Sequence, residues 1–313
     1  MKIQSICEQY AAFRKALGER FEVNGRQLKA FWRAMGPDID IKNILPEKVN
    51  ALLVGKGPLT TSWCVRHDAF LGFYRYAISR GFIATSPLPL VIPKLPPTFQ
   101  PYIYSSAELR RILCSTESCC RPRSDLDAAA MRSLILLMYG AALRTSEALS
   151  LTIGNVDLSG AVLTVRDSKF FKTRLVRIGP TTLRVLSEYA GCRHASSRNP
   201  DPPFFVGRNS KRIPIHMFER AFKQIRLHAG LRREGGSRRQ PRLHDLRHTS
   251  AVHRLIAWYQ EGKDVQKLLP GLSVYIGHAQ LAATQTYLTM TPDLLREASL
   301  RFERYAMQED SDA

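Results

Sequence analysis

The sequence has no run of apolar residues long enough to cross a membrane. Its longest apolar stretch, LILLMYGAAL, occupies residues 134–143, whereas a membrane-spanning helix needs about 20 residues. The first residues, MKIQSICEQYAAFRKAL, contain neither the apolar segment nor the cleavage site of a signal peptide. We therefore expect a cytoplasmic protein with no membrane partner.

Cysteine is scarce as well, and its spacing excludes two classes of small domain. The 313 residues include six cysteines, and no two of them form a C-x-x-C pair. Neither a zinc ribbon nor a disulfide framework is therefore indicated. Reduced thiols in the cytosol are the simplest interpretation.

Acidic residues are too few to balance the basic ones. The 27 Asp and Glu stand against 46 Lys and Arg, which gives a formal net charge of +19. An excess of this size predicts a polyanionic partner, with nucleic acid as the leading candidate. An anionic membrane surface is less favoured, because the basic residues are spread along the chain and do not form one basic amphipathic helix.

A proline-rich segment divides the chain. Residues 1–86 contain four stretches with apolar residues at helical spacing, the last of which ends at Gly81. The segment SPLPLVIPKLPPTFQP follows, and its six prolines exclude both helix and sheet interior. We therefore predict a helical domain over 1–86, a linker over 87–103 and a second domain over 104–313.

The second domain is predicted to be mainly helical with a small β-sheet. AVLTV at 161–165 and RLVRI at 174–178 are short β-branched runs that flank DSKFFKT, which indicates a β-hairpin. Helical spacing returns over 212–230 and 243–260. An amphipathic helix is also expected in the tail at 293–307, with Leu294, Leu295, Ala298, Phe302 and Tyr305 on one side.

Three segments of this domain carry unusual polar residues. In ALRTSEALSL, Arg144 follows an apolar helix and Glu147 lies three residues on, although a capping segment with a surface arginine would have the same pattern. In RLHDLRHTSAVH, His244 and Arg247 share one helix face. In IGHAQLAATQTYL, Tyr287 follows His278 by nine residues and could be either a nucleophile or a packing residue.

A metal site is the alternative for the second segment. HDLRH resembles the H-E-x-x-H motif of zinc hydrolases, with His244 and His248 at i and i+4. However, Asp245 is one methylene shorter than the usual general base, Arg247 would repel a dication, and no third ligand is evident. We therefore expect no metal and no other cofactor.

Together these residues suit metal-free chemistry on a phosphodiester. Two arginine forks can stabilise the charge that spreads over the equatorial oxygens when phosphorus is attacked. A tyrosine nucleophile would form a covalent phosphotyrosyl intermediate, so strands could be rejoined without ATP.

In this order the three motifs resemble the tyrosine recombinases, also called phage integrases. The resemblance implies a helical core-binding domain and an α+β catalytic domain that close as a C-shaped clamp on double-stranded DNA. It implies a bacterial, nucleoid-associated enzyme that cuts and rejoins DNA at a specific core site, in integration, excision or transposition of a mobile element.

The resemblance also implies roles for individual residues. Tyr287 would attack phosphorus and hold the 3′ phosphate, and Arg144 with Arg247 would clamp it. His244 would act in proton transfer at the tyrosine oxygen, and His278 would hydrogen-bond the phosphate. Glu147 would support the site from behind the residues that touch DNA.

The family's hairpin lysine would protonate the departing 5′ oxygen. Lys169 is the best match, but the chain reads Ser168-Lys169-Phe170 where the family usually has Gly-Lys-Gly. Lys172 therefore remains an alternative for the general acid and is otherwise a DNA contact.

The same resemblance predicts further DNA contacts and a homotetramer on paired sites, with or without sister recombinases. The C-terminal helix would dock onto a neighbouring protomer, with packing onto its own chain as the alternative. The candidate DNA contacts lie on the helix TTSWCVRHDAFLGFYRY and in the arginine-rich segment 232–242, and they are Thr61, Ser62, Arg66, Arg75, Arg232, Arg238 and Arg239.

Two other functions share most of these features. A relaxing topoisomerase of type IB uses similar residues, but would act as a monomer with little sequence preference. A DNA-binding protein that has lost catalysis would have no need of an isolated Tyr287.

Overall fold

The computed structural model describes residues 1–55, 59–94, 100–119, 126–166, 173–193, 201–236, 239–278, 280–289 and 292–309, with backbone only at 289 and 304–309. The chain divides into two compact units, Met1–Thr98 and Phe99–Ala313. The division falls inside the proline-rich segment 87–103. The mainly helical class with one small sheet, predicted from the sequence, is confirmed.

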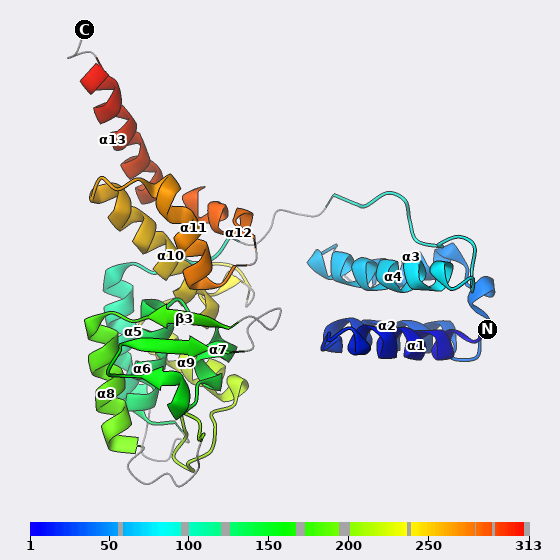
Figure 1. Cartoon of the computed structure of the whole chain (residues 1–313), viewed down its shortest axis with the longest axis horizontal. Helices are drawn as coiled ribbons and strands as arrows, with labels where there is room; N and C mark the ends of the chain where they lie inside the picture. Colours follow the sequence, from blue (N-terminus) through cyan, green and yellow to red (C-terminus); the bar gives the residue numbers. More distant parts are fainter. Residues whose placement is uncertain are drawn as a thin grey trace. The chain divides into compact units, whose positions relative to one another are not determined.

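Among its described residues, the first unit has four α-helices, which lie in two layers (Figure 1). Its helices are α1 (Ile3–Ala16), α2 (Glu22–Met35), α3 (Pro46–Val54) and α4 (Thr61–Ser79). The helices α1 and α2 pack together, and both contact α4, which also packs against α3. Aromatic residues fill the centre: Phe31, Phe70, Phe73 and Tyr74 are almost fully buried.

Arg66 joins two helices of this unit. From α4 its Nε and Nη2 donate to the carbonyl oxygen of Leu53, at 3.1 and 2.5 Å, at the C-terminal end of α3. The last carbonyls of a helix have no partner within it, so this guanidinium satisfies a group that would otherwise need water. Gly81, in the left-handed region with φ of +73°, follows α4 at the place where the sequence predicts its end.

The second unit contains nine helices among the residues that the structure describes, together with the sheet. They are α5 (Ser106–Cys119), α6 (Ala128–Gly140), α7 (Thr145–Ser150), α8 (Pro180–Arg193), α9 (Ile215–His228), α10 (Leu243–Gln260), α11 (Val265–Ile276), α12 (Ala282–Gln285) and α13 (Pro292–Glu309). The apolar helix α6 is central and packs against α5, α8 and α10. Its Met131, Leu134, Leu137 and Met138 are all fully buried.

The sheet contains the predicted hairpin and one strand more. The antiparallel strands β2 (Val162–Val165) and β3 (Arg174–Arg177) pair with Val162 opposite Arg177 and Val165 opposite Arg174, which confirms the hairpin. The short strand β1 (Val156–Asp157) adds to the other edge of β2. Residues 167–172, which join β2 to β3, lie outside the described residues.

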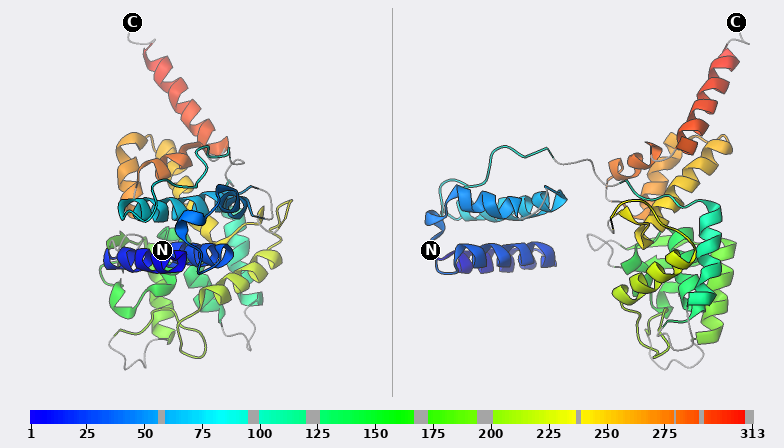
Figure 2. Two further views of the ribbon diagram at one scale, coloured as in Figure 1. Left: turned by 90° about the vertical axis from the view of Figure 1, so that its right-hand side faces the viewer. Right: turned by 180° about the vertical axis from the view of Figure 1, so that it is seen from behind.

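The C-terminal helices form a separate apolar cluster around α10. Ala142, Val252, Leu255, Leu272, Tyr287 and Leu294 belong to it. Leu294 anchors α13, which packs against α10 near its own N-terminus and then extends away from α10 and α11 in both views of this unit (Figures 1 and 2). Leu295, Leu300 and Phe302 of α13 remain exposed. Among the described helices, none is long and apolar enough to span a membrane.

Truncation of a side chain on α6 tests whether this helix is the centre of the second unit. Leu137→Ala removes a fully buried side chain, so we expect the free energy of unfolding to fall by about 2–5 kcal/mol. Leu175→Ala, on a side chain of β3 that is 70% exposed, should change it by less than about 0.5 kcal/mol. Urea unfolding monitored by circular dichroism measures both, and equal losses would contradict the assignment.

Candidate active site

The site is organised around a buried carboxylate at the start of α7. The backbone N–H of Arg144 donates to Oε2 of Glu147 at 2.9 Å, which closes the first turn of the helix. This contact points the Glu147 side chain back toward the helix N-terminus. Glu147 is only 5% exposed, so its charge has to be satisfied by protein groups.

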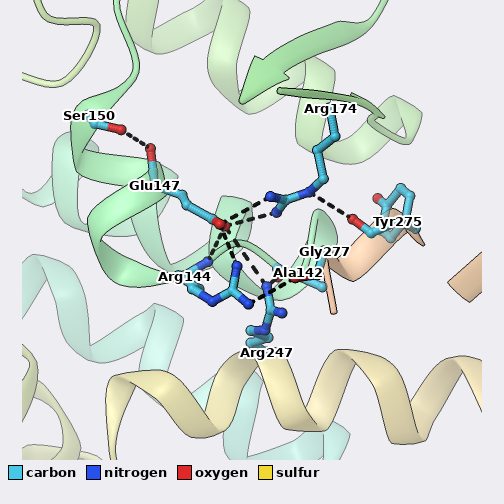
Figure 3. Close-up of polar contacts among 8 residues, drawn as sticks. All are labelled: Ala142, Arg144, Glu147, Ser150, Arg174, Arg247, Tyr275 and Gly277. Atoms are coloured by element: carbon cyan, nitrogen blue, oxygen red, sulfur yellow. Dashed lines mark hydrogen bonds and ion pairs between the residues drawn. The ribbon is translucent and has the colours of Figure 1, made fainter. Parts of the chain in front are cut away.

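Three guanidinium groups surround this carboxylate (Figure 3). Arg174, the first residue of β3, binds it in bidentate fashion, with Nη1 at 3.0 Å from Oε1 and Nη2 at 2.8 Å from Oε2. Arg144 Nη1 donates to Oε1 at 2.6 Å. Arg247 of α10 is the most distant, with Nη1 at 3.9 Å from Oε2. One carboxylate therefore holds side chains from α7, β3 and α10 together.

The arginines keep Glu147 ionised in spite of its burial. Burial alone would raise the pKa of the carboxyl, but the hydrogen bonds and positive charges of Arg174 and Arg144 outweigh it and lower the pKa to about 2. Because one negative charge faces three positive ones, the cluster keeps a net positive charge. It is therefore suited to binding an anion.

Arg247 has one donor, Nη2, without a hydrogen-bond partner among the described residues. The side chain is almost fully buried, and its Nη1 donates to the carbonyl oxygen of Ala142 at 2.7 Å. Its Nη2 is buried and has no hydrogen-bond partner in the part of the chain that the structure describes. Burial, together with the neighbouring charge of Arg144, lowers the pKa of Arg247 to about 10, so it is still cationic at neutral pH. A buried guanidinium with one free donor is suited to binding an anion.

Two of these arginines also fix the segment that carries His278. Arg144 Nη2 donates to the carbonyl oxygen of Gly277 at 2.9 Å, and Arg174 Nε donates to that of Tyr275 at 3.2 Å. Both carbonyls lie at the C-terminal end of α11, where the negative end of the helix dipole favours cations. Gly277 has a φ of +75° and ends the helix, and a Cβ placed there would lie 2.7 Å from Nη1 of Arg174.

Tyr287 lies between two imidazole rings. Its hydroxyl is 2.9 Å from Nδ1 of His248. The ring of His278 stacks against the Tyr287 ring, with 5.8 Å between the centroids and 20° between the planes. Nδ1 of His278 is 2.8 Å from Oγ1 of Thr284, which holds that ring in place. The tyrosine is only 1% exposed.

The electrostatics of the site favour neutral side chains around Tyr287. Burial and the nearby positive groups lower the pKa of His248 to about 3 and that of His278 to about 4. Burial raises the pKa of Tyr287, although Arg247 and Arg144 oppose this effect. At neutral pH the site therefore combines cationic arginines with neutral imidazoles and a neutral phenol.

Most residues singled out from the sequence come together here. Arg144, Glu147, Arg247, His278 and Tyr287 meet directly or through one another, as described above. His244 lies one turn before His248 on α10, and the two rings meet edge to face with centroids 4.7 Å apart. Lys169, Lys172 and Arg238 lie outside the described residues.

No metal site accompanies the two histidines of α10. Within the described ranges, no group of three or more His, Cys, Asp or Glu side chains is arranged to hold a metal ion. Asp245, which would be the general base of a zinc hydrolase, is fully buried and pairs with Arg242 at the start of α10.

The remaining candidates lie on the surface. Thr61, Ser62 and Arg75 are exposed on α4, and Arg232 and Arg239 are exposed in the arginine-rich segment. Arg66 differs from them, because its guanidinium binds the end of α3.

Sequence reasoning missed three residues of the site. Arg174 was noticed only as part of a strand, and Thr284 was not considered. His248 was weighed only as a metal ligand, although its position next to Arg247 and one turn after His244 could have suggested a place in the site.

The comparisons with known proteins agree on one family. The Phage integrase family model matches residues 105–293. The chain is 34% identical over 298 residues to y4rE of Sinorhizobium fredii, an inferred integrase/recombinase, and covers 94% of both proteins. It is 26% identical over 309 residues to the tyrosine recombinase XerD of Rhizobium meliloti, covering 94% of this chain and 92% of XerD.

Solved structures share the fold at low sequence identity. The Tn1549 transposon integrase in complex with transposon right-end DNA is similar with a TM-score of 0.69, at 14% identity and with 98% of this chain and 100% of that chain covered. A lambda integrase tetramer bound to a Holliday junction is similar with a TM-score of 0.68, at 16% identity and with 92% and 77% covered.

The role of Glu147 can be tested through stability and its pH dependence. Glu147→Gln removes the charge that three guanidiniums share, so we expect the free energy of unfolding at pH 7 to fall by about 3–5 kcal/mol. In the wild type the pKa of Glu147 falls from an ordinary 4.5 to about 2 on folding, which is worth on the order of 3 kcal/mol. This stabilisation is fully present above pH 4.5 and is lost as the pH falls through 2.

Urea unfolding between pH 7 and pH 2.5 measures the free energies of unfolding of the wild type and of Glu147→Gln. The gap between these two free energies should narrow below pH 4.5. Glu188→Gln, at an exposed carboxylate 4.0 Å from Arg184, is the matched control and should cost less than about 1 kcal/mol. A gap that stays constant over this pH range would contradict the assignment.

Proposed function

Because this chain belongs to the phage integrase family of tyrosine recombinases, we propose that it cuts and rejoins DNA strands at a specific site through a covalent 3′-phosphotyrosyl intermediate. The reaction needs neither metal nor ATP, since the phosphotyrosyl bond preserves the energy of the phosphodiester. Integration, excision and transposition of a mobile element all use this chemistry. Such an enzyme would work at the bacterial nucleoid.

One observation carries this proposal: four separate segments of the chain bring their polar side chains to one place. Arg144 reaches the carbonyl oxygen of Gly277, Arg174 and Arg247 reach Glu147, and His248 reaches Tyr287. A protein that only bound DNA would not need a buried tyrosine next to this cationic cluster.

The scissile phosphate would bind the two arginines that border Tyr287. Arg247 offers the unpartnered Nη2, and Arg144 supplies a second guanidinium that Glu147 and Gly277 hold in position. Both would stabilise the additional negative charge that the phosphorane oxygens carry in the transition state. Glu147 would act without touching DNA, by holding these guanidiniums.

Tyr287 would be the nucleophile, and its oxygen would displace the 5′ oxygen from phosphorus. His278, stacked on the tyrosine ring, would hydrogen-bond a phosphate oxygen, and His244 would belong to the group that moves the tyrosine proton. Lys169 would protonate the departing 5′ oxygen. Lys172 is its alternative on sequence grounds.

The two predicted domains would divide the recognition of DNA. We propose that residues 1–86 form the core-binding domain and 104–313 the catalytic domain, joined by 87–103. Thr61, Ser62 and Arg75 would contact the duplex from α4, and Arg232, Arg238 and Arg239 would contact phosphates. Arg66 suits this role less well, since it already joins α4 to α3. Affinity should fall steeply as salt is raised.

A homotetramer on paired sites would use the exposed apolar side of α13. Leu294 packs within its own chain, whereas Leu295, Leu300 and Phe302 are exposed. Exposed large apolar side chains on one projecting helix are typical of a surface that another protomer covers. This arrangement supports docking in trans through the outer part of the helix.

The covalent intermediate provides the direct test of the reaction. Purified protein is incubated with nicked suicide duplexes in EDTA, using candidate sites that flank its gene, and the products are separated on denaturing gels. We expect an adduct that migrates more slowly than free DNA with the wild type and none with Tyr287→Phe. Tyr275→Phe is a matched control, because that hydroxyl binds the backbone carbonyls of Gly140 and Arg177. Tight DNA binding without an adduct on any substrate would contradict the proposal.

Docking through α13 can be tested by sedimentation of protein–DNA complexes. The double variant Leu295→Ser/Phe302→Ser should still bind single sites, but should lose most of the complexes that contain more than one protomer. Ile215→Ser changes a partly exposed side chain of α9 and should leave assembly unchanged. An unchanged distribution of complexes for the double variant would favour packing of α13 within its own chain.

A further inference from the structure

His248 is the imidazole that contacts the Tyr287 oxygen. Nδ1 of His248 lies 2.9 Å from the hydroxyl, which is an ordinary hydrogen-bond distance. The resemblance to the family gives the proton transfer to His244. In the described part of the chain, however, His244 has no hydrogen bond to Tyr287 and contacts His248 instead.

The other histidine beside the tyrosine is oriented for a different task. His278 lies nearly parallel to the Tyr287 ring, with the centroids 5.8 Å apart, and its Nδ1 is hydrogen-bonded to Thr284. Among the described residues, His278 makes no hydrogen bond to the Tyr287 hydroxyl. Of the three imidazoles, only His248 therefore has a ring nitrogen aligned to accept the tyrosine proton.

A phenol needs such an acceptor in order to attack phosphorus. Burial raises the pKa of Tyr287 above its ordinary value of 10, so very little phenolate exists at neutral pH. A neutral imidazole that carries its hydrogen on Nε2 presents a free lone pair at Nδ1. In that tautomer the lone pair would accept the Tyr287 hydroxyl hydrogen across the 2.9 Å contact.

We propose that His248 is the general base of the reaction, a role that rests on the proposed function. As the bond between the Tyr287 oxygen and phosphorus forms, the O–H proton passes to Nδ1 of His248. The bond from phosphorus to the 5′ oxygen breaks, and that oxygen keeps the bonding pair and takes a proton from the general acid. In religation each proton returns by the reverse route, so the enzyme is regenerated.

The surroundings of His248 couple this proton transfer to DNA binding. On α10 the ring is close to His244, Arg247 and Arg242, and from the segment after α11 it faces His278. Burial and these groups keep the pKa of His248 low, at about 3, so in these surroundings the ring is a weak base. A bound phosphate would offset the charge of the arginines and raise the basicity of His248. The tyrosine would then be activated only when its target is in place.

The test separates proton acceptance from simple hydrogen bonding. Asn at position 248 can place an amide oxygen near the position of Nδ1 and accept the hydroxyl hydrogen, but it cannot carry the proton away. We expect both His248→Asn and His248→Ala to slow single-turnover cleavage of the suicide duplex by about 10²–10⁴-fold. DNA affinity, measured by mobility shift, should stay within a few-fold of the wild type.

The matched control lies on the same helix. Nδ1 of His253 is also hydrogen-bonded to a tyrosine hydroxyl, that of Tyr139, at 2.9 Å. His253→Asn therefore makes the same change at an equivalent partly buried contact outside the site and should cleave at the wild-type rate. This control separates the loss of a base from a general loosening of α10.

Two further readouts distinguish the base from other roles. The first readout uses a substrate in which sulfur replaces the 5′ oxygen, so that the leaving group no longer needs a proton. If Lys169 is the general acid, this substrate should restore the cleavage rate of Lys169→Ala. It should not restore the cleavage rate of His248→Asn. The rate for His248→Asn should rise tenfold per pH unit between pH 6 and 9, whereas the wild type should level off where His248 in the DNA complex becomes neutral.

The outcomes are distinct. Wild-type rates for His248→Asn, or its rescue by the sulfur substrate, would overturn the assignment of His248 while the wild-type adduct still supports the proposed function. Failure of the wild type to form any adduct on any substrate would instead overturn the proposed function, and with it this role.

Discussion

The buried carboxylate of Glu147 is the constraint on which the site depends. A charge removed from water is tolerated only when it is paired and hydrogen-bonded, and here the partners come from α7, β3 and α10. An apolar residue could fill the same volume at a lower desolvation cost. It could not hold three guanidiniums close together, because their mutual repulsion would be uncompensated. The excess of positive charge that remains is what an incoming phosphate requires.

The sequence predicted the fold class well and singled out several residues that meet in the structure, for physical reasons. Amphipathic spacing revealed the helices, and two β-branched runs revealed the hairpin of β2 and β3. Arg144, Arg247 and Tyr287 were found because their residue types are unusual beside apolar segments. The active-site roles of Arg174 and His248 were missed. Each depends on a contact with a residue 27 or 39 positions away in the chain, and local spacing contains no information on such pairs.

Tyr287 packs in an apolar cluster and also makes a polar contact through its hydroxyl. The residue packs in the apolar cluster of α10, α11 and α13, as an ordinary core tyrosine would. Its hydroxyl nevertheless ends at an imidazole and not at a backbone carbonyl. The two interpretations that the sequence left open, packing residue and nucleophile, are therefore compatible. Packing positions the ring, and the polar contact positions the oxygen.

Gly277 shows how little freedom some positions of this site have. The backbone at this position is left-handed, with φ of +75°, a conformation that residues with a side chain rarely adopt. A Cβ there would also overlap the guanidinium of Arg174. A library that randomises residues around the site to change its target should therefore keep glycine at 277. Positions 61, 62 and 75 are exposed and meet no such restriction, so these proposed DNA contacts can vary while the arginine cluster around Glu147 stays unchanged.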